Sequence, residues 1–498
     1  DITGATITQD ANDIRAFAQV NTVVNTLAAT GTTLPDVEGG ANAPTATLLG
    51  PTGQITFNDA TFGIGSNQLN ALSVIAELTG TPGDPVRIQT IVDAADTISG
   101  TTISEIGNKL VAQAGANTSK NRLDLDFVSN DGQAFVGNVQ QSASAPTVTA
   151  NVANAAILVD ADGAGATVIN GSAINLNANT IGAVGTVNDT SNILVSKGTT
   201  LTSSSDDTTP NTVIDPGTGV IVNADYGVIN AQGPQSLAGV SDSVSTSVTG
   251  ATIQTVVDTL NSGTLTVDNN VVGASGTIHS AYNGLGLFSG AAVDDPLGVA
   301  GVSASVASQQ VVTLGSTASA TVTGVNLNIT VDSAANMDAS AMSVSGNTTS
   351  GTAIGGTVTN QLVVDSGATI VGGATAPAPL ASLPTANGDF NIVNSQRSGD
   401  TVSITSDIQS SKMGIDITSL SSGDAVTVDN NLVESTARGF LASNTISLRA
   451  GAASDATSQL INSQVIGGAA INADIDTVDI SATFDDAAGA VLNGAVSV

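Results

Sequence analysis

Few side chains in this sequence have types and spacing suited to acid–base, nucleophilic or metal chemistry. His279 is the only histidine, and the chain contains no cysteine. This composition rules out a Cys/His pair and an ordinary zinc cluster. A Ser-His-Asp triad would have to use His279 itself, and no supporting motif surrounds that residue. We therefore predict a non-enzymatic protein without catalytic residues.

Carboxylates are plentiful, and Ca²⁺ is the cofactor that they would suit best. The segment Asp160-Ala161-Asp162-Gly163 resembles part of a calcium loop, but the twelfth position is Gly171 instead of the closing Glu of an EF-hand. Asp160 and Asp162 are the candidate metal ligands. The alternative, which stays open, is that these residues only form a turn.

The strongest pattern is a pair of asparagines spaced thirteen residues apart. The pairs are Asn12/Asn25, Asn138/Asn151, Asn179/Asn192, Asn270/Asn283, Asn347/Asn360 and Asn431/Asn444. A small residue always follows the first Asn by six positions, and an apolar residue always follows the second by two, as Gly185 and Leu194 do. Spacing and flanks that recur together predict a repeat architecture.

The repeated asparagines have three structural interpretations. Side chains on successive repeats could stack into amide ladders, or each Asn could form its turn independently. The third is a hairpin module that places the two Asn of a pair on paired strands. His279 lies nine residues after Asn270, and the matching positions hold residues as different as Asn21, Gly356 and Phe440. This variation predicts a surface or loop position for His279.

The elements that carry these residues are predicted to be short strands. Thr, Val and Ile alternate with polar residues along most of the chain, and Gly, Asn, Asp and Ser interrupt them at short intervals. The copies at Asn138 and Asn179 suggest a period of roughly 40 to 45 residues. We therefore predict an all-β fold, a β-solenoid (parallel β-helix) rod in which neighbouring repeats cover one another.

One stretch departs from this pattern and predicts a small, partly helical N-terminal insert. Apolar residues with helical spacing are Leu69, Leu72, Ile75 and Ala76, followed by Ile103, Ile106 and Leu110. Glu105 and Lys109 are spaced as an i,i+4 ion pair. The predicted organisation is a β segment with the first repeat in residues 1–66, the insert or small domain in 67–122, and solenoid repeats in 123–498.

The charge of the chain argues against two classes of partner. The formal net charge is −32, and only 10 residues are Lys or Arg, which leaves no basic patch for nucleic acid or an anionic membrane surface. No run of about 18 apolar residues could span a bilayer. A start at Asp1 and the lack of cysteine are typical of a secreted bacterial protein whose signal peptide has been removed, so we expect an extracellular or cell-surface location.

The repeat is clearest from Val428 to Gly439, which leads to Asn444-Thr445-Ile446-Ser447-Leu448. This segment resembles the repeats of large secreted β-solenoid surface proteins of alphaproteobacteria, and the resemblance covers roughly two-thirds of the chain. It implies an extracellular structural or adhesive role, with a filament subunit as one form, and it carries over no catalytic residue. The first copy departs from the pattern at Arg15 and Phe17.

Three functions follow as hypotheses. The first is a homopolymeric subunit of an extracellular filament or surface layer, which assembles through solenoid ends or through the uncharged, strand-like segments 2–8 and 490–498. The second is a monomeric adhesin stalk whose residues 67–122 bind a surface or glycan. The third is a calcium-dependent, carbohydrate-active β-helix enzyme, which the scarcity of basic and aromatic side chains disfavours.

Overall fold

The chain folds into β-strands throughout the part that the computed structural model describes. That part comprises residues 1–35, 46–50, 53–57, 61–92, 97–162, 168–203, 211–215, 219–234, 240–290, 298–332, 339–372, 385–418, 424–484 and 495–497. These residues contain no helix, so the all-β prediction is confirmed. The strands form six sheets, which we number I to VI in the order in which the chain first enters them.

Sheet III contains the longest strands and forms one side of the molecule. Its long strands are β3 (Asp13–Leu34), β11 (Lys109–Asn130), β16 (Thr180–Gly198), β24 (Val271–Ser289), β29 (Thr348–Ser366) and β35 (Leu432–Ala450). Its short strands are β17 (Thr200–Thr202), β25 (Val299–Ala300) and β30 (Ile370–Val371).

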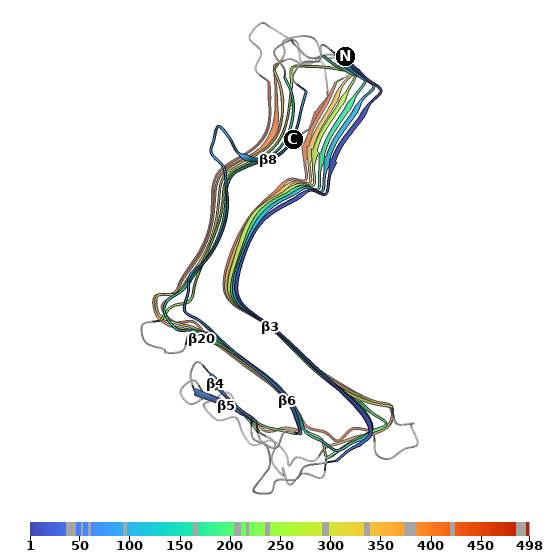
Figure 1. Cartoon of the computed structure of the whole chain (residues 1–498), viewed down its shortest axis with the longest axis vertical. Coiled ribbons are helices and arrows are strands. Elements are labelled where there is room, and N and C mark those ends of the chain that lie inside the picture. Colours follow the sequence, from blue (N-terminus) through green and yellow to red (C-terminus); the bar gives the residue numbers. More distant parts are fainter. Residues whose placement is uncertain are drawn as a thin grey trace.

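Sheets V and VI lie opposite sheet III (Figure 1). Sheet V consists of β6 (Phe62–Asn70), β12 (Ala134–Ser142), β20 (Tyr226–Pro234), β26 (Ala304–Val312), β32 (Phe390–Ser398) and β36 (Ser458–Val465). Sheet VI consists of β7 (Val74–Thr79), β8 (Val86–Ile91), β13 (Thr147–Ala161), β21 (Ser243–Val257), β27 (Thr317–Val331), β33 (Ser403–Ile417) and β37 (Ala470–Phe484).

Sheets I, II and IV are built from shorter strands. Sheet I consists of β1 (Ile2–Thr3), β9 (Thr97–Ser99), β14 (Val168–Asn170) and β22 (Thr259–Asn261). Sheet II consists of β2 (Thr6–Asp10), β10 (Thr102–Ile106), β15 (Ala173–Asn177), β23 (Thr264–Asp268), β28 (Ala341–Ser345), β34 (Ala425–Asp429) and β38 (Ala495–Ser497). Sheet IV, which includes antiparallel pairs, consists of β4 (Ala46–Gly50), β5 (Gly53–Phe57), β18 (Asn211–Asp215), β19 (Gly219–Asn223) and β31 (Thr385–Ala386).

The chain passes through the parallel sheets in the order I, II, III, V and VI and then begins again, except that the last two passages have no described strand in sheet I and start with β28 and β34 of sheet II. We call each passage a circuit. Corresponding strands pair in parallel and in register, as β16 does with β11 on one side and β24 on the other. Figure 1 looks down the shortest axis of the molecule, so the strands of each sheet lie over one another in the view.

The circuits are longer than the sequence period suggested. Hydrogen-bonded residues in adjacent circuits are 96 positions apart for Asn12 and Asn108 but 71 apart for Asn108 and Asn179. The connection between sheets III and V causes much of this variation, because it runs from Leu34 to Phe62 in one circuit and only from Asn130 to Ala134 in the next. The period of 40 to 45 residues is therefore wrong.

The structure does not show the predicted rod. Neighbouring strands lie ~4.8 Å apart, so the six-stranded sheet V extends only about 24 Å along the stack. The longest axis of the molecule instead runs within the circuits (Figure 1). The fold is all-β and dominated by parallel sheets.

The core follows the alternation of the long strands. Leu123, Leu194, Leu285 and Leu362 are successive inward residues of sheet III, and all are buried. Strands β12, β20 and β26 of sheet V are buried at every position, because their inner face meets this core and their outer face meets sheet IV. The rings of Phe57 and Phe135 stack there with centroids 5.2 Å apart.

The predicted helical insert is not seen. Residues 67 and 122 fall inside β6 and β11, and the described residues between them form strands. Leu69, Leu72 and Ile75 lie at or beside the outermost strands β6 and β7, where they are 47%, 65% and 58% exposed. Their helix-like spacing therefore reflects an apolar sheet edge.

Candidate functional site

A first ladder of asparagines marks the corner between sheets II and III. Its members are Asn12, Asn108, Asn179, Asn270, Asn347 and Asn431. In the middle of the ladder, the backbone N and Nδ2 of Asn179 donate to Asn270 Oδ1 over 2.9 and 3.0 Å. Asn179 Nδ2 also donates to the carbonyl of Glu105 in the preceding circuit. Each central Asn therefore joins three circuits.

The residue before each of these asparagines adopts a left-handed backbone conformation. These residues are Ala11, Gly107, Ala178, Asn269, Gly346 and Asn430, with φ between 52° and 68°. Gly and Asn tolerate this conformation, whereas Ala adopts it at a cost. The corner is therefore set by a left-handed residue followed by an Asn that satisfies the backbone groups of the turn.

A second ladder runs through sheet III thirteen residues later. Its members are Asn25, Asn121, Asn192, Asn283, Asn360 and Asn444. Each Nδ2 donates to the Oδ1 of the next circuit over 2.7 to 2.9 Å. The structure thus holds stacked amides, and these are the two members of the repeated Asn pair.

Packing explains the small residue and the apolar residue that recur with each Asn pair. Gly185 and Gly276 point at sheet VI, where a Cβ at Gly185 would lie 2.7 Å from Val244. Sheets III and VI approach too closely there for a large side chain. The apolar residue after the second Asn, such as Leu194, points into the core opposite sheet V.

One of the predicted Asn pairs, Asn138/Asn151, does not belong to the two ladders, and one pair that does belong was not predicted. Asn138 lies in β12 of sheet V and bonds to Asn230, and Asn151 lies in β13 of sheet VI and accepts from Ser247. In the second circuit, the two ladder positions are occupied by Asn108 and Asn121. That pair has the same spacing, with Ala114 and Leu123 at the flanking positions.

The helical interpretation of residues 67–122 concealed the Asn108/Asn121 pair. The signal was present in the sequence, since both the spacing and the flanks match. The accidental match at Asn138 also produced the false short period.

A ladder of glutamines in sheet V was not predicted. Its members are Gln68, Gln140, Gln232, Gln310, Gln396 and Gln464, joined by bonds of 2.6 to 2.8 Å. Each central amide also crosses the core to sheet III, as Gln232 Nε2 does to the carbonyl of Ser280. The sequence signal is weak, because the intervals between these glutamines are as irregular as the circuits.

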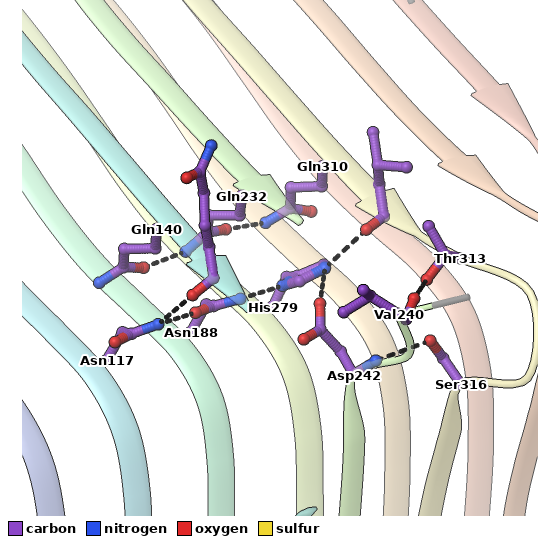
Figure 2. Close-up of polar contacts among 12 residues, drawn as sticks. Asn117, Gln140, Asn188, Gln232, Val240, Asp242, His279, Gln310, Thr313 and Ser316 are labelled. Atoms are coloured by element: carbon purple, nitrogen blue, oxygen red, sulfur yellow. Dashed lines mark hydrogen bonds and ion pairs between the residues drawn. The ribbon is translucent and has the colours of Figure 1, made fainter. Parts of the chain in front are cut away.

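His279 ends a third, shorter column. Asn21, Asn117 and Asn188 bond in sequence, and Asn188 Nδ2 then lies 3.1 Å from His279 Nδ1 (Figure 2). The other ring nitrogen, Nε2, lies 3.0 Å from the carbonyl of Val311. Because that carbonyl can only accept, Nε2 carries the proton and Nδ1 accepts from Asn188. The surface or loop position predicted for His279 is wrong, since the residue is fully buried.

Asp242 is the charged partner of His279. Its Oδ2 lies 3.7 Å from His279 Nε2, and both side chains are inaccessible to solvent. Burial raises the pKa of Asp242, partly offset by His279, and burial lowers the pKa of His279. Both shifts favour the uncharged forms of the two side chains. No atom of either side chain is exposed to solvent.

A titration of the single imidazole tests this arrangement. We expect the ¹⁵N shifts of His279 to remain those of the neutral Nε2–H tautomer as the pH falls below 6.5, because burial lowers its pKa. The unfolded chain gains this proton near pH 6.5, so His279 makes the folded state less stable as the pH falls further. An imidazole that titrates at 6.5 while the fold stays intact would contradict the burial.

Asp160 and Asp162 lie at and just beyond the end of β13. The backbone N of Asp162 donates to Asp160 Oδ1 over 3.3 Å, and the hydrogen bond from Asp160 raises the pKa of the Asp162 carboxyl. Gly163 lies outside the described residues. Within the described part of the chain, no three His, Cys, Asp or Glu residues are grouped as metal ligands. Calcium binding at this pair stays a prediction.

A groove crosses the outer face of sheet III near the ends of its long strands. Its volume is about 790 Å³. Successive circuits contribute Asp126, Lys197, Phe288, Asp365 and Arg449, which are register neighbours along the stack. The groove therefore presents charges of both signs around Phe288, and Phe127 also lines it.

No protein-family model, curated protein or solved structure matches this chain. Among the residues that the structure describes, none forms a helix long and apolar enough to cross a membrane.

Proposed function

We propose that the chain is a non-enzymatic structural subunit of an extracellular bacterial filament or surface layer, built as a β-solenoid. The observation that carries this proposal is the pair of outermost circuits. Strands β3 and β37 each have a parallel neighbour on one side only among the described residues. Such strands present unpaired backbone groups, which are templates for pairing with another chain.

The side chains of these edge strands support association. Phe17 and Val24 on β3 are 60% and 68% exposed, and Leu460 and Val465 on β36 are 47% and 53% exposed. Apolar exposure of this extent favours burial against a partner. The amide ladders end at the same edges, where a further circuit could extend their hydrogen bonds.

The terminal segments take part in the edges. Within residues 2–8, β1 pairs with β9, and β2 pairs with β10. Within residues 490–498, β38 pairs with β34, and residues 490–494 and 498 lie outside the described part. Each terminal strand thus has a partner within the chain on one side and an edge on the other, so both remain candidates for contact with a neighbouring subunit.

Negative-stain microscopy of the purified chain over a range of salt concentrations tests the proposal. We expect filaments or layers that repeat along the stacking direction. We also expect them to grow faster at higher ionic strength, because salt screens the repulsion between copies of net charge −32. Sedimentation measures the assembled fraction in the same samples. Single particles at every salt and protein concentration would refute assembly.

A second candidate is a monomeric adhesin that binds a surface or glycan, and the groove on sheet III favours it. The binding region is then the strip around Phe288, not residues 67–122, whose described strands belong to the sheets themselves. Single particles that bind a polysaccharide, and lose this binding on Phe288→Ala, would be the outcome expected for an adhesin. The calcium-dependent enzyme and the location outside the cell stay predictions.

A further inference from the structure

We infer that one copy of this chain receives a second copy head to tail, with β3, β6 and β7 of the incoming copy added to β35, β36 and β37 in the register that joins circuits within the chain. This inference rests on the proposed assembly. It goes further by naming the occupant of the edge, its direction and its register.

The asparagine ladders have a direction. The backbone N and Nδ2 of Asn347 both donate to Asn431 Oδ1 over 3.0 Å, and Asn360 Nδ2 donates to Asn444 Oδ1 over 2.7 Å. Donors therefore point toward the circuit that follows. At the edge of β35, Asn431 Nδ2 donates one hydrogen back to the carbonyl of Val344 over 2.8 Å, which leaves its second hydrogen for a following circuit. Asn444 presents its amide at the same edge, and at the opposite edge Asn12 presents the acceptor Oδ1 that a preceding circuit would use.

The glutamine ladder runs in the opposite direction. Gln464 Nε2 donates back to Gln396 Oε1 over 2.6 Å, and Gln140 Nε2 donates back to Gln68 Oε1 over 2.8 Å. The edge of β36 therefore presents the acceptor Oε1 of Gln464. The edge of β6 presents the amide of Gln68, which also donates to the carbonyl of Thr118.

The two directions together select the orientation of the partner. One edge offers asparagine donors and a glutamine acceptor, and the other edge offers asparagine acceptors and a glutamine donor. Two identical edges brought together would offer the asparagine donors no asparagine acceptor and the glutamine acceptor no glutamine donor, which leaves buried amides unsatisfied. A head-to-tail contact satisfies all three ladders at once.

The apolar columns continue across the same contact. In this register, Ile64 of the incoming copy lies beside Leu460 of the receiving copy. In the same way, Leu78 lies beside Ile475 and Leu27 lies beside Ile446. Leu27 and Ile446 already pack against the core cluster between sheets III and V. The incoming circuit would therefore extend the existing core instead of forming a new one.

Two pairs of opposite charge support the register. Arg15 of the incoming copy falls beside Glu434, and Arg87 falls beside Asp479. Cross-strand pairs of opposite charge stabilise the pairing of neighbouring strands. Within one copy, Arg15 forms an ion pair of 2.8 Å with Asp13, which lies two residues away on the same edge strand β3.

Two pairs of like charge oppose the contact. Glu77 would fall beside Asp474, and Asp10 beside Asp429. These pairs make the contact dependent on salt, because salt screens their repulsion. They explain how the same surface could be stable in one ionic condition and separate in another.

Strand β38 competes for part of the contact. It pairs with β34 through Ala425 and Val426, at the position that β2 of the incoming copy would take. The incoming strand must displace it. Deletion of residues 490–498 should therefore speed assembly, whereas loss of assembly would show that β38 is itself donated to the neighbour.

Disulfide trapping tests the register, because the chain has no cysteine of its own. Thr26 and Thr445 are exposed residues of one outward column of sheet III, so Thr26→Cys and Thr445→Cys place sulfurs on strands about 4.8 Å apart in the proposed contact. This separation lies within the range of roughly 4.4 to 6.8 Å that a disulfide needs between Cα atoms.

The matched control combines Thr26→Cys with Ser447→Cys, which lies two residues further along the same exposed face. That shift puts the Cα atoms about 8 Å apart, beyond the reach of a disulfide. We expect disulfide-linked multimers on non-reducing gels to be at least tenfold more abundant for the first variant. Single-cysteine variants should yield no more dimer than the control.

The outcomes separate the two proposals. Filaments with equal or no cross-linking in the two variants would overturn the register while leaving assembly intact. Efficient dimers of Thr445→Cys alone would show like edges meeting, which also overturns it. If neither variant nor the unmodified chain assembles, the proposed function fails together with the inference.

Discussion

Replacing Asn270 by Ala should lower the free energy of unfolding by roughly 3 to 5 kcal/mol. The side chain of Asn270 accepts from the backbone N and Nδ2 of Asn179 and donates to the carbonyl of Leu176 and to Asn347 Oδ1. Its removal leaves buried backbone groups without partners, and each such group costs about 1 to 3 kcal/mol. Urea unfolding followed by circular dichroism measures the change.

The matched control is Asn12→Ala at the exposed end of the same ladder. The side chain of Asn12 donates to Asn108 Oδ1 and lies where water can replace it. We expect a loss of less than about 1 kcal/mol for this variant. Equal losses at Asn12 and Asn270 would mean that the ladder contributes no cooperative stabilisation across circuits.

Replacing Glu105 by Gln should remove a large pH dependence of stability. Glu105 lies in β10 between Gln9 and Leu176, and its side chain is inaccessible to solvent. Burial raises the pKa of Glu105 to about 8, and a hydrogen-bonding contact with Thr90 offsets this only in part. The carboxyl is therefore protonated at pH 7, in place of the ion pair with Lys109 that the sequence suggested.

The sign of the effect follows from proton binding. Between pH 4.5 and about 8 the folded state keeps the Glu105 proton while the unfolded state loses it, so stability falls as the pH rises. The slope approaches about 1.4 kcal/mol per pH unit, and the penalty is constant above the folded pKa. Stability of the Glu105→Gln variant should lack this slope.

The control for Glu105→Gln is Glu77→Gln, which changes an exposed glutamate on β7. Urea unfolding at pH 5, 6, 7 and 8 gives the three stability curves. We expect the free energy of unfolding of Glu77→Gln to change with pH as that of the unmodified chain does. The free energy of unfolding of Glu105→Gln should rise relative to both as the pH rises. Parallel curves for all three proteins would show that Glu105 is hydrated or paired in the folded state.

The local composition of the chain predicted the class of the fold. Thr/Val/Ile alternation, scarce aromatic residues and frequent Gly, Asn and Asp require many strands and tight turns, and the described residues contain strands without helix. The thirteen-residue spacing was also readable, because both asparagines lie on one continuous stretch between a corner and the middle of a strand. Asn270 and Asn283 show this within β24 and the turn before it.

Pairing between circuits could not be predicted in the same way. Partners such as Asn108 and Asn179 are 71 residues apart, whereas Asn12 and Asn108 are 96 apart, because connections of different length separate the sheets. No fixed period exists for a sequence comparison to find. The glutamine ladder remained hidden for this reason, and Asn138 was assigned to the wrong column.

The sequence by itself determined an acidic, all-β chain with a recurring Asn pair, since these properties depend on residue type and on neighbours along the chain. Only the tertiary structure decided which residues are buried. Leu69 has apolar chemistry but lies exposed on an edge strand, whereas Glu105 and His279 have polar chemistry but lie inside the core. Burial depends on which strands are stacked on either side. That stacking is set by contacts between residues far apart along the chain, such as the 71 positions between Asn108 and Asn179 or the 96 between Asn12 and Asn108.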